Sequence, residues 1–143
     1  MTRRALVTGG AGFIGSHAVD LFVAQGYDVT ILDDFSSGRE ENVNPKAMVV
    51  RDSIASQSAA ALISDGRFDI VLHFAAQIDV RKSVEDPAWD AALNIGGSLN
   101  LLEAIRRSGR NTRFIFSSSG GAQYGDLVAI PTVENAAKGT MSP

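Results

Sequence analysis

The 143 residues contain no cysteine and few histidine, tryptophan or tyrosine residues, with two, one and two copies. Without cysteine the chain forms neither disulfide bonds nor thiolate metal sites, and its two separate histidines suggest no metal site either. The net charge of −3 gives no sign of a nucleic-acid partner. No run approaches the roughly 18 apolar residues of a membrane span. We therefore expect a cytoplasmic protein that binds neither nucleic acid nor membrane.

Short apolar segments alternate with longer, amphipathic ones along the chain. We predict strands at 4–8, 28–33, 47–50, 69–76 and 112–119, helices at 13–25, 55–65 and 87–108, and loop after Tyr124. The alternation is typical of right-handed βαβ units. The predicted fold class is therefore α/β, a doubly wound parallel sheet of about five strands in one domain, residues 1–143.

A glycine-rich segment, VTGGAGFIGSH, follows the first predicted strand and opens the first predicted helix. Gly9, Gly12 and Gly15 are spaced G-x-x-G-x-x-G, and Gly10, Gly12 and Gly15 also satisfy G-x-G-x-x-G. Glycine lets the backbone turn tightly and approach a pyrophosphate, which the free N–H groups of the helix N-terminus then bind. This context predicts a dinucleotide-binding Rossmann domain.

An acidic residue, Asp33, ends the second predicted strand, at the position where a carboxylate accepts hydrogen bonds from the adenosine ribose. The competing interpretation is an ordinary aspartate in a turn. Asp33 and Asp34 together would repel a 2′-phosphate, so we expect NAD rather than NADP as the cofactor, although Arg39 lies nearby and could take a phosphate.

With TGGAGFIG, HFAAQIDVRKSVEDP and SSSGGAQYGD in this order, the chain resembles the extended short-chain dehydrogenase/reductase family, and within it the bacterial UDP-glucose 4-epimerases. The resemblance covers the whole chain. It implies an NAD-dependent isomerase that oxidises a UDP-sugar transiently at C4, lets the keto-sugar rotate, and returns hydride to its other face. It also implies a homodimeric parent protein.

The resemblance assigns cofactor contacts to residues that leave the carboxyl ends of the predicted strands. Beyond the three glycines and Asp33, these are Phe13 and Ile14 at the pyrophosphate; Asp34, Phe35, Ser36, Ser37 and Gly38 around the ribose; Asp52 and Ser53 beside the adenine; Phe74, Ala75, Ala76, Gln77 and Ile78 after the fourth strand; and Asn94 and Ser117. The charged stretch 81–86 is either a solvated turn or a loop near the substrate.

Catalysis in this family, as the resemblance implies, needs a serine that matches Ser119 and a Tyr-x-x-x-Lys pair on the next helix. The 143 residues contain no Tyr-x-x-x-Lys. Family members commonly carry Ser-Pro directly before the tyrosine, and here Ser142 and Pro143 are the last two residues. We therefore expect an incomplete domain, inactive alone, with its catalytic helix and substrate domain missing and apolar surface exposed on the last strand and the long helix.

Other functions stay open at this point. Nucleotide-sugar dehydratases of the family carry Thr-Asp-Glu after the fifth strand, whereas Ser119-Gly120-Gly121 here hold no proton-transfer groups beyond the serine, which favours epimerisation. A UDP-glucuronate decarboxylase is less well excluded. A non-catalytic NAD-binding module and a bare fragment of a fold are the remaining alternatives, and NAD affinity separates them.

Overall fold

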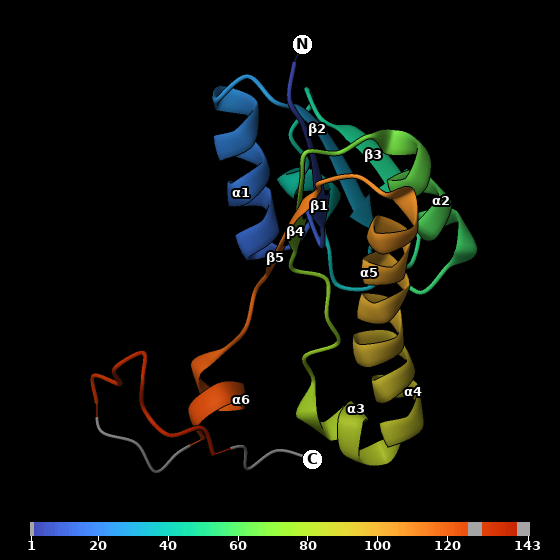
Figure 1. The fold of residues 1–143 in the computed structure, drawn as a ribbon. Helices are drawn as coiled ribbons and strands as arrows, with labels where there is room; N and C mark the ends of the chain where they lie inside the picture. The colour runs from blue at the N-terminus through green and yellow to red at the C-terminus, as the bar shows by residue number, and fades with distance from the viewer. Residues whose placement is uncertain (1, 126–129, 140–143) are drawn as a thin grey trace.

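A computed structural model describes residues 2–125 and 130–139 of the chain (Figure 1). Its strands are β1 (Arg4–Thr8), β2 (Asp28–Asp33), β3 (Met48–Arg51), β4 (Ile70–His73) and β5 (Arg113–Phe116). Its helices are α1 (Phe13–Ala24), α2 (Gln57–Gly66), α3 (Val80–Glu85), α4 (Pro87–Ala91), α5 (Gly97–Ser108) and α6 (Gly120–Tyr124), with a 3₁₀ turn at Glu40–Asn42 and a π-helical turn at Ala92–Gly96 between α4 and α5.

The five strands form one parallel sheet in the order β3-β2-β1-β4-β5. The chain winds outward from β1 to β3 and then returns to the other side of β1 for β4, so the direction of winding reverses between β1 and β4. The predicted doubly wound α/β fold is thereby confirmed. Ligands bind such sheets at the carboxyl ends of the strands beside this reversal, where Thr8 of β1 pairs with Leu32 of β2 and His73 of β4.

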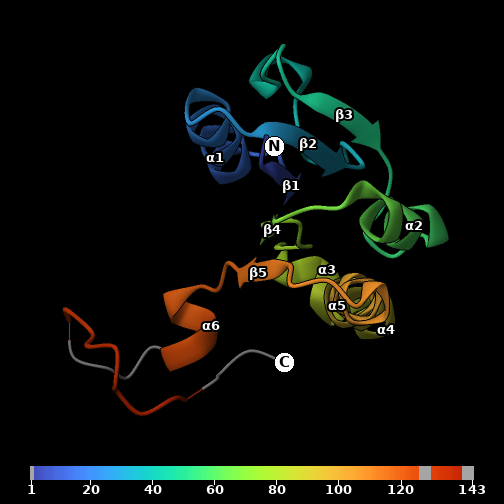
Figure 2. The ribbon, with the colours of Figure 1, turned by 45° about the horizontal axis from the view of Figure 1, so that its top comes forward.

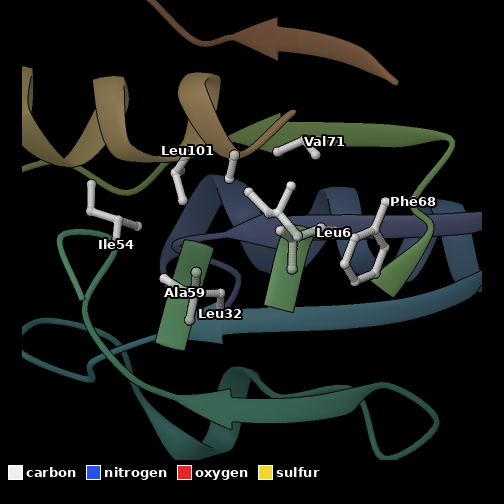
Figure 3. Close-up of a cluster of buried hydrophobic side chains, with 9 residues drawn as sticks. Leu6, Leu32, Ile54, Ala59, Phe68, Val71 and Leu101 are labelled. Atoms are coloured by element: carbon white, nitrogen blue, oxygen red, sulfur yellow. The ribbon is translucent and has the colours of Figure 1, made fainter. Parts of the chain in front are cut away.

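Each face of the sheet is covered by its own apolar cluster because successive strand residues point to opposite sides. Leu6, Leu32 and Val71 pack with Ile54, Phe68 and Leu101 beneath α2 and α5, as Figure 3 shows. The alternate residues, among them Val7, Ile31 and Leu72, pack beneath α1. Figure 2 shows α1 on one side of the sheet and α2 with α5 on the other. The sheet is therefore covered by apolar packing on both faces.

Two strands end earlier than the sequence pattern predicted. β4 ends at His73 instead of continuing to residue 76, and β5 ends at Phe116 instead of residue 119. One further ladder bond follows β4, from the amide of Phe74 to the carbonyl of Thr8 (3.1 Å), but the next amide, that of Ala75, donates to the Thr8 side chain instead. The chain therefore leaves the sheet where apolar sequence still favoured a strand.

Two short helices were not predicted. Asp79 accepts a hydrogen bond from the Arg81 amide and begins α3, so the charged stretch 81–86 is largely helical and not a turn. Ser119 accepts from the Ala122 amide and begins α6 within a stretch taken as the end of a strand. Both follow from side-chain capping, which short polar residues provide with little sequence signal. Figure 1 shows α3, α4 and α6 beyond the carboxyl ends of the strands.

The apolar side chains of the first helix are only partly buried. Ile14 and Leu21 are 62% and 55% exposed, and Gly15, Ser16 and Val19 face the sheet. The close contact of Gly15 with the preceding turn sets the rotation of the helix. Ile14 and Leu21 are thereby turned to the side.

The predicted exposure of apolar side chains on β5 and the long helix is confirmed. Ile115 and Phe116 on β5 are 43% and 59% exposed, and Ile95 and Leu99 on the long helix are 62% and 55% exposed. Within the described part of the chain, no helix is both long and apolar enough to cross a bilayer. Ser142 and Pro143, on which the expectation of an incomplete domain depended, lie outside the described residues.

Candidate nucleotide site

The glycine turn connects β1 to α1, and Gly9, Gly12 and Gly15 meet different surroundings in it. Gly9 has φ +68°, and a Cβ there would lie 2.7 Å from the Ala75 amide nitrogen. A Cβ on Gly15 would overlap the Gly9 carbonyl oxygen. A Cβ on Gly12 would meet only that same carbonyl oxygen, at 3.2 Å. Gly9 and Gly15 are thus required by packing, whereas the surface over Gly12 is left open to a ligand.

The N-terminus of α1 lies directly beyond Gly12. Gly12 caps the helix with no side-chain hydrogen bond, and the first turn holds no acidic residue. The first amides of a helix have no partner within it and carry the positive end of the helix dipole. Phe13 and Ile14 flank this end with exposed side chains, 78% and 62% accessible. The arrangement suits an anionic group with an apolar neighbour.

Asp33 is buried and joins the glycine turn to the loop after β2. Its Oδ2 accepts from the Ala11 amide and its Oδ1 from the Phe35 amide, each at 2.9 Å. Phe35 adopts the left-handed conformation, φ +58°, and a Cβ on Gly38 would lie 2.8 Å from Asp33 Oδ1. The predicted ribose loop 34–38 is thus folded around the carboxylate. A carboxylate has about four acceptor sites, so it can accept further hydrogen bonds.

The end of β3 places Asp52 beside the strand end that carries Asp33, through a bond from the Asp52 amide to the Asp33 carbonyl (3.1 Å). Hydroxyl donation from Ser58 and then Ser56 lowers the pKa of the Asp52 carboxyl, outweighing its partial desolvation. Ser53 donates its amide to the same carboxylate. Asp52 is therefore an anion held by local donors, with its orientation determined before any ligand arrives.

The loop after β4 contains Phe74, Ala75, Ala76, Gln77 and Ile78. Phe74 and Ala75 lie against Gly9, so this loop packs directly on the glycine turn. Asn94 holds the backbone of Gln77 by two hydrogen bonds. The Gln77 amide donates to Asn94 Oδ1 (2.8 Å), and Asn94 Nδ2 donates to the Gln77 carbonyl (3.0 Å). Ile78 is 85% exposed. Asn94, proposed from the sequence as a cofactor contact, thus also binds this loop directly.

The serines after β5 lie further along the same edge. The Ser117 amide donates to the His73 carbonyl (3.1 Å), which keeps Ser117 beside the end of β4. Ser119 Oγ accepts from the Ala122 amide (3.2 Å) as the cap of α6, and among residues 2–125 and 130–139 its own proton has no acceptor. Both serine side chains are exposed. Tyr124 Oη donates to the Glu134 carbonyl (3.1 Å), so this tyrosine is not directed at Ser119.

His73, the last residue of β4, is both buried and hydrogen-bonded. Nδ1 lies 2.7 Å from Thr8 Oγ1 and Nε2 lies 3.0 Å from Ser98 Oγ. Burial lowers the pKa of His73 to about 4, so the ring is neutral near pH 7. Thr8 and Ser98 were not among the site residues predicted from the sequence. The signal available for Thr8 was a hydroxyl residue at the end of an apolar strand; Ser98 offered none.

Residues 5–143 match the NAD dependent epimerase/dehydratase family. The chain belongs to this family.

Among members of the family, the UDP-glucose 4-epimerase of Mycolicibacterium smegmatis is 41% identical over 98% of this chain and 46% of that enzyme. The solved UDP-glucose 4-epimerase of Thermotoga maritima, with UDP-glucose, is 45% identical and superposes with a TM-score of 0.88 over 97% of this chain and 45% of its own. That of Thermus thermophilus, in complex with NAD, is 41% identical with a TM-score of 0.82 over 92% and 42%. The chain thus spans less than half the length of these relatives.

Proposed function

We propose that these residues are the NAD-binding part of a nucleotide-sugar 4-epimerase. The observation that carries the proposal is the open surface over Gly12, in a turn that leads into the capless N-terminus of α1 and contacts buried Asp33 and the Ala75 loop. A pyrophosphate fits beside unpaired helix amides, and a ribose fits beside a carboxylate that still has acceptor sites. Relatives of this chain include epimerases solved with NAD and with UDP-glucose.

Each part of the site has a defined task in this proposal. The amides at the start of α1 bind the pyrophosphate, and Asp33 orients the adenosine ribose. The Phe74–Ile78 loop contacts the nicotinamide end, and Ser119 directs its hydroxyl proton toward a substrate oxygen. NAD, when bound, supplies the hydride acceptor for the sugar carbon. No Tyr-x-x-x-Lys occurs in the 143 residues, so we expect them to bind the cofactor without turning over UDP-galactose.

Epimerisation is favoured over dehydration by the chemistry after β5. Elimination of water needs an acid and a base at the sugar, and Ser119-Gly120-Gly121 offer a single hydroxyl and no carboxylate. NAD is favoured over NADP by the adjacent Asp33 and Asp34. Arg39, the one nearby cation considered for a 2′-phosphate, forms an ion pair with Glu41 (3.1 Å).

Calorimetric titration of NAD into the wild-type chain and a Gly12→Ala variant tests the proposal. A methyl group on Gly12 would touch only one carbonyl oxygen of the protein, so the fold should persist while the ligand loses its approach. We expect NAD to bind about tenfold or more weakly, because the added methyl group keeps the pyrophosphate from its closest approach to the backbone. Ser108→Ala is the control, since Ser108 is the last residue of α5, outside the π-helical turn, where its hydroxyl donates to the Ile105 carbonyl (2.7 Å). Equal NAD affinity in wild type and Gly12→Ala would refute the assignment, as would tighter binding of NADP than NAD.

A further inference from the structure

A chain of hydrogen bonds runs through the buried ring of His73 from the loop after β4 to the π-helical turn. It begins at the Ala75 amide, which donates to Thr8 Oγ1 (3.2 Å), and continues through His73 to Ser98 Oγ. Ser98 Oγ lies 2.6 Å from the Asn94 backbone carbonyl. The side chains of Thr8, His73 and Ser98 thus connect β1, β4 and the long helix by hydrogen bonds.

The donor and the acceptor of each hydrogen bond in this series follow from its last member, the Asn94 carbonyl. A carbonyl oxygen only accepts, so the Ser98 hydroxyl must donate to Asn94. That hydroxyl has no second proton, so it accepts from His73, whose Nε2 must carry hydrogen. A neutral ring then leaves Nδ1 as an acceptor, which Thr8 satisfies by donation. A cationic ring would instead leave the buried Thr8 proton without an acceptor.

The same series of hydrogen bonds ends at Asn94, which also holds the loop after β4. Asn94 lies in the π-helical turn Ala92–Gly96, and back-donation from a serine four residues later is a common cause of helix distortion. From this turn Asn94 forms both bonds to the Gln77 backbone, at 2.8 and 3.0 Å. Its Nδ2 is also 3.2 Å from Asp90 Oδ1, which accepts as well from the Gln77 side chain (2.9 Å). The position of Gln77 therefore depends on the backbone geometry at Asn94.

We propose that His73 is a positioning residue, fixed as the Nε2–H tautomer between Thr8 and Ser98. In this position it holds the π-helical turn so that Asn94 binds Gln77. The loop after β4 is thereby preformed for its ligand. The identity of that ligand as NAD rests on the proposed function. The placement of the loop rests on the hydrogen bonds alone. A π-helical turn often lies at a functional site, and here it brings a side-chain amide to a loop backbone.

Two measurements on the full 143-residue chain test the positioning role without any ligand. Long-range proton–nitrogen spectra of the imidazole rings should show His73 with hydrogen on Nε2 and none on Nδ1; a His17→Gln variant assigns the two rings. Amide hydrogen exchange in Ser98→Ala should accelerate about tenfold at Gln77, the loss expected for about one hydrogen bond. The Ile31 amide, in the middle of β2, should keep its exchange rate.

Ser108→Ala is the matched control because Ser108 Oγ also donates to a helix carbonyl, that of Ile105 (2.7 Å), at the far end of α5. Ser98→Thr keeps the hydroxyl and should restore slow exchange at Gln77. An Nδ1–H tautomer would overturn the proposal, as would Gln77 exchange that Ser98→Ala leaves unchanged or that Ser108→Ala accelerates equally. These outcomes do not depend on cofactor binding.

Titration of NAD into the same variants separates the two proposals. Ser98→Ala should weaken NAD binding about three- to tenfold, the cost of ordering a loosened loop, while Ser108→Ala should bind as wild type. Wild-type protein that binds no NAD would refute the proposed function and leave the exchange result to decide on His73. Wild-type protein that binds NAD, with Ser98→Ala binding equally well, would show that the loop is not positioned for this cofactor.

Discussion

Replacing Asp33 by asparagine changes one side-chain oxygen of a buried group into an NH₂ and should destabilise the protein. Both carboxylate oxygens accept from backbone amides, those of Ala11 and Phe35, at 2.9 Å. Asparagine has one oxygen, so in either orientation its NH₂ faces an N–H donor. Hydrogen bonds to charged groups contribute about 1.5–3 kcal/mol, and the Phe35 amide is half-buried, so we expect a loss of about 2 kcal/mol.

Asp34→Asn is the matched control. Asp34 is exposed and uses only Oδ1, which accepts from the amide and the hydroxyl of Ser36 at 2.9 and 2.6 Å, and an asparagine oxygen can accept both. We expect a change below about 0.5 kcal/mol for this exposed substitution. Equilibrium unfolding in urea measures both variants. Equal stability losses for Asp33→Asn and Asp34→Asn would refute the claim that Asp33 holds the glycine turn and the ribose loop together.

Three further predictions concern the core, a helix cap and pH. Leu101→Ala, at a fully buried position, should cost about 2–5 kcal/mol in urea unfolding, and Leu102→Ala, at a 41% exposed position, much less. Ser56→Ala removes the acceptor of the Ala59 amide (3.0 Å) and a hydroxyl donor to Asp52 (2.8 Å) and should cost about 1 kcal/mol, most of which Ser56→Thr, which keeps the hydroxyl, should restore. His73 titrates at about 4 when folded and near 6.5 when unfolded, so the unfolded chain binds more protons between these values, and stability should fall by about 2 kcal/mol from about pH 7.5 to about pH 5. His73→Gln should lack this part of the slope, and an identical slope in both proteins would show that His73 is not buried in neutral form.

Local features of the sequence were sufficient to predict most strands and the main helices, and to predict the glycine turn. β1 and β2 have the predicted bounds, and the long helix begins at Pro87 and ends before Gly109, because apolar period, proline and glycine act within a few residues of one another. The parallel direction of the strands followed from the βαβ rhythm, whereas their order in the sheet was not predicted. The position of Asp33 at the end of a buried strand was equally visible.

Contacts between distant residues decided the rest. The strand β4 ends at His73 because Gly9, 64 positions earlier, brings its turn against Ala75, and no local pattern contains that contact. The rotation of α1 depends on Gly15 meeting the Gly9 carbonyl. The chain from Thr8 through His73 to Ser98 needs β1, β4 and the long helix in place together. Sequence periodicity reports which face of an element is apolar, whereas hydrogen-bond partners far apart in the chain exist only once the sheet has brought its strand ends together.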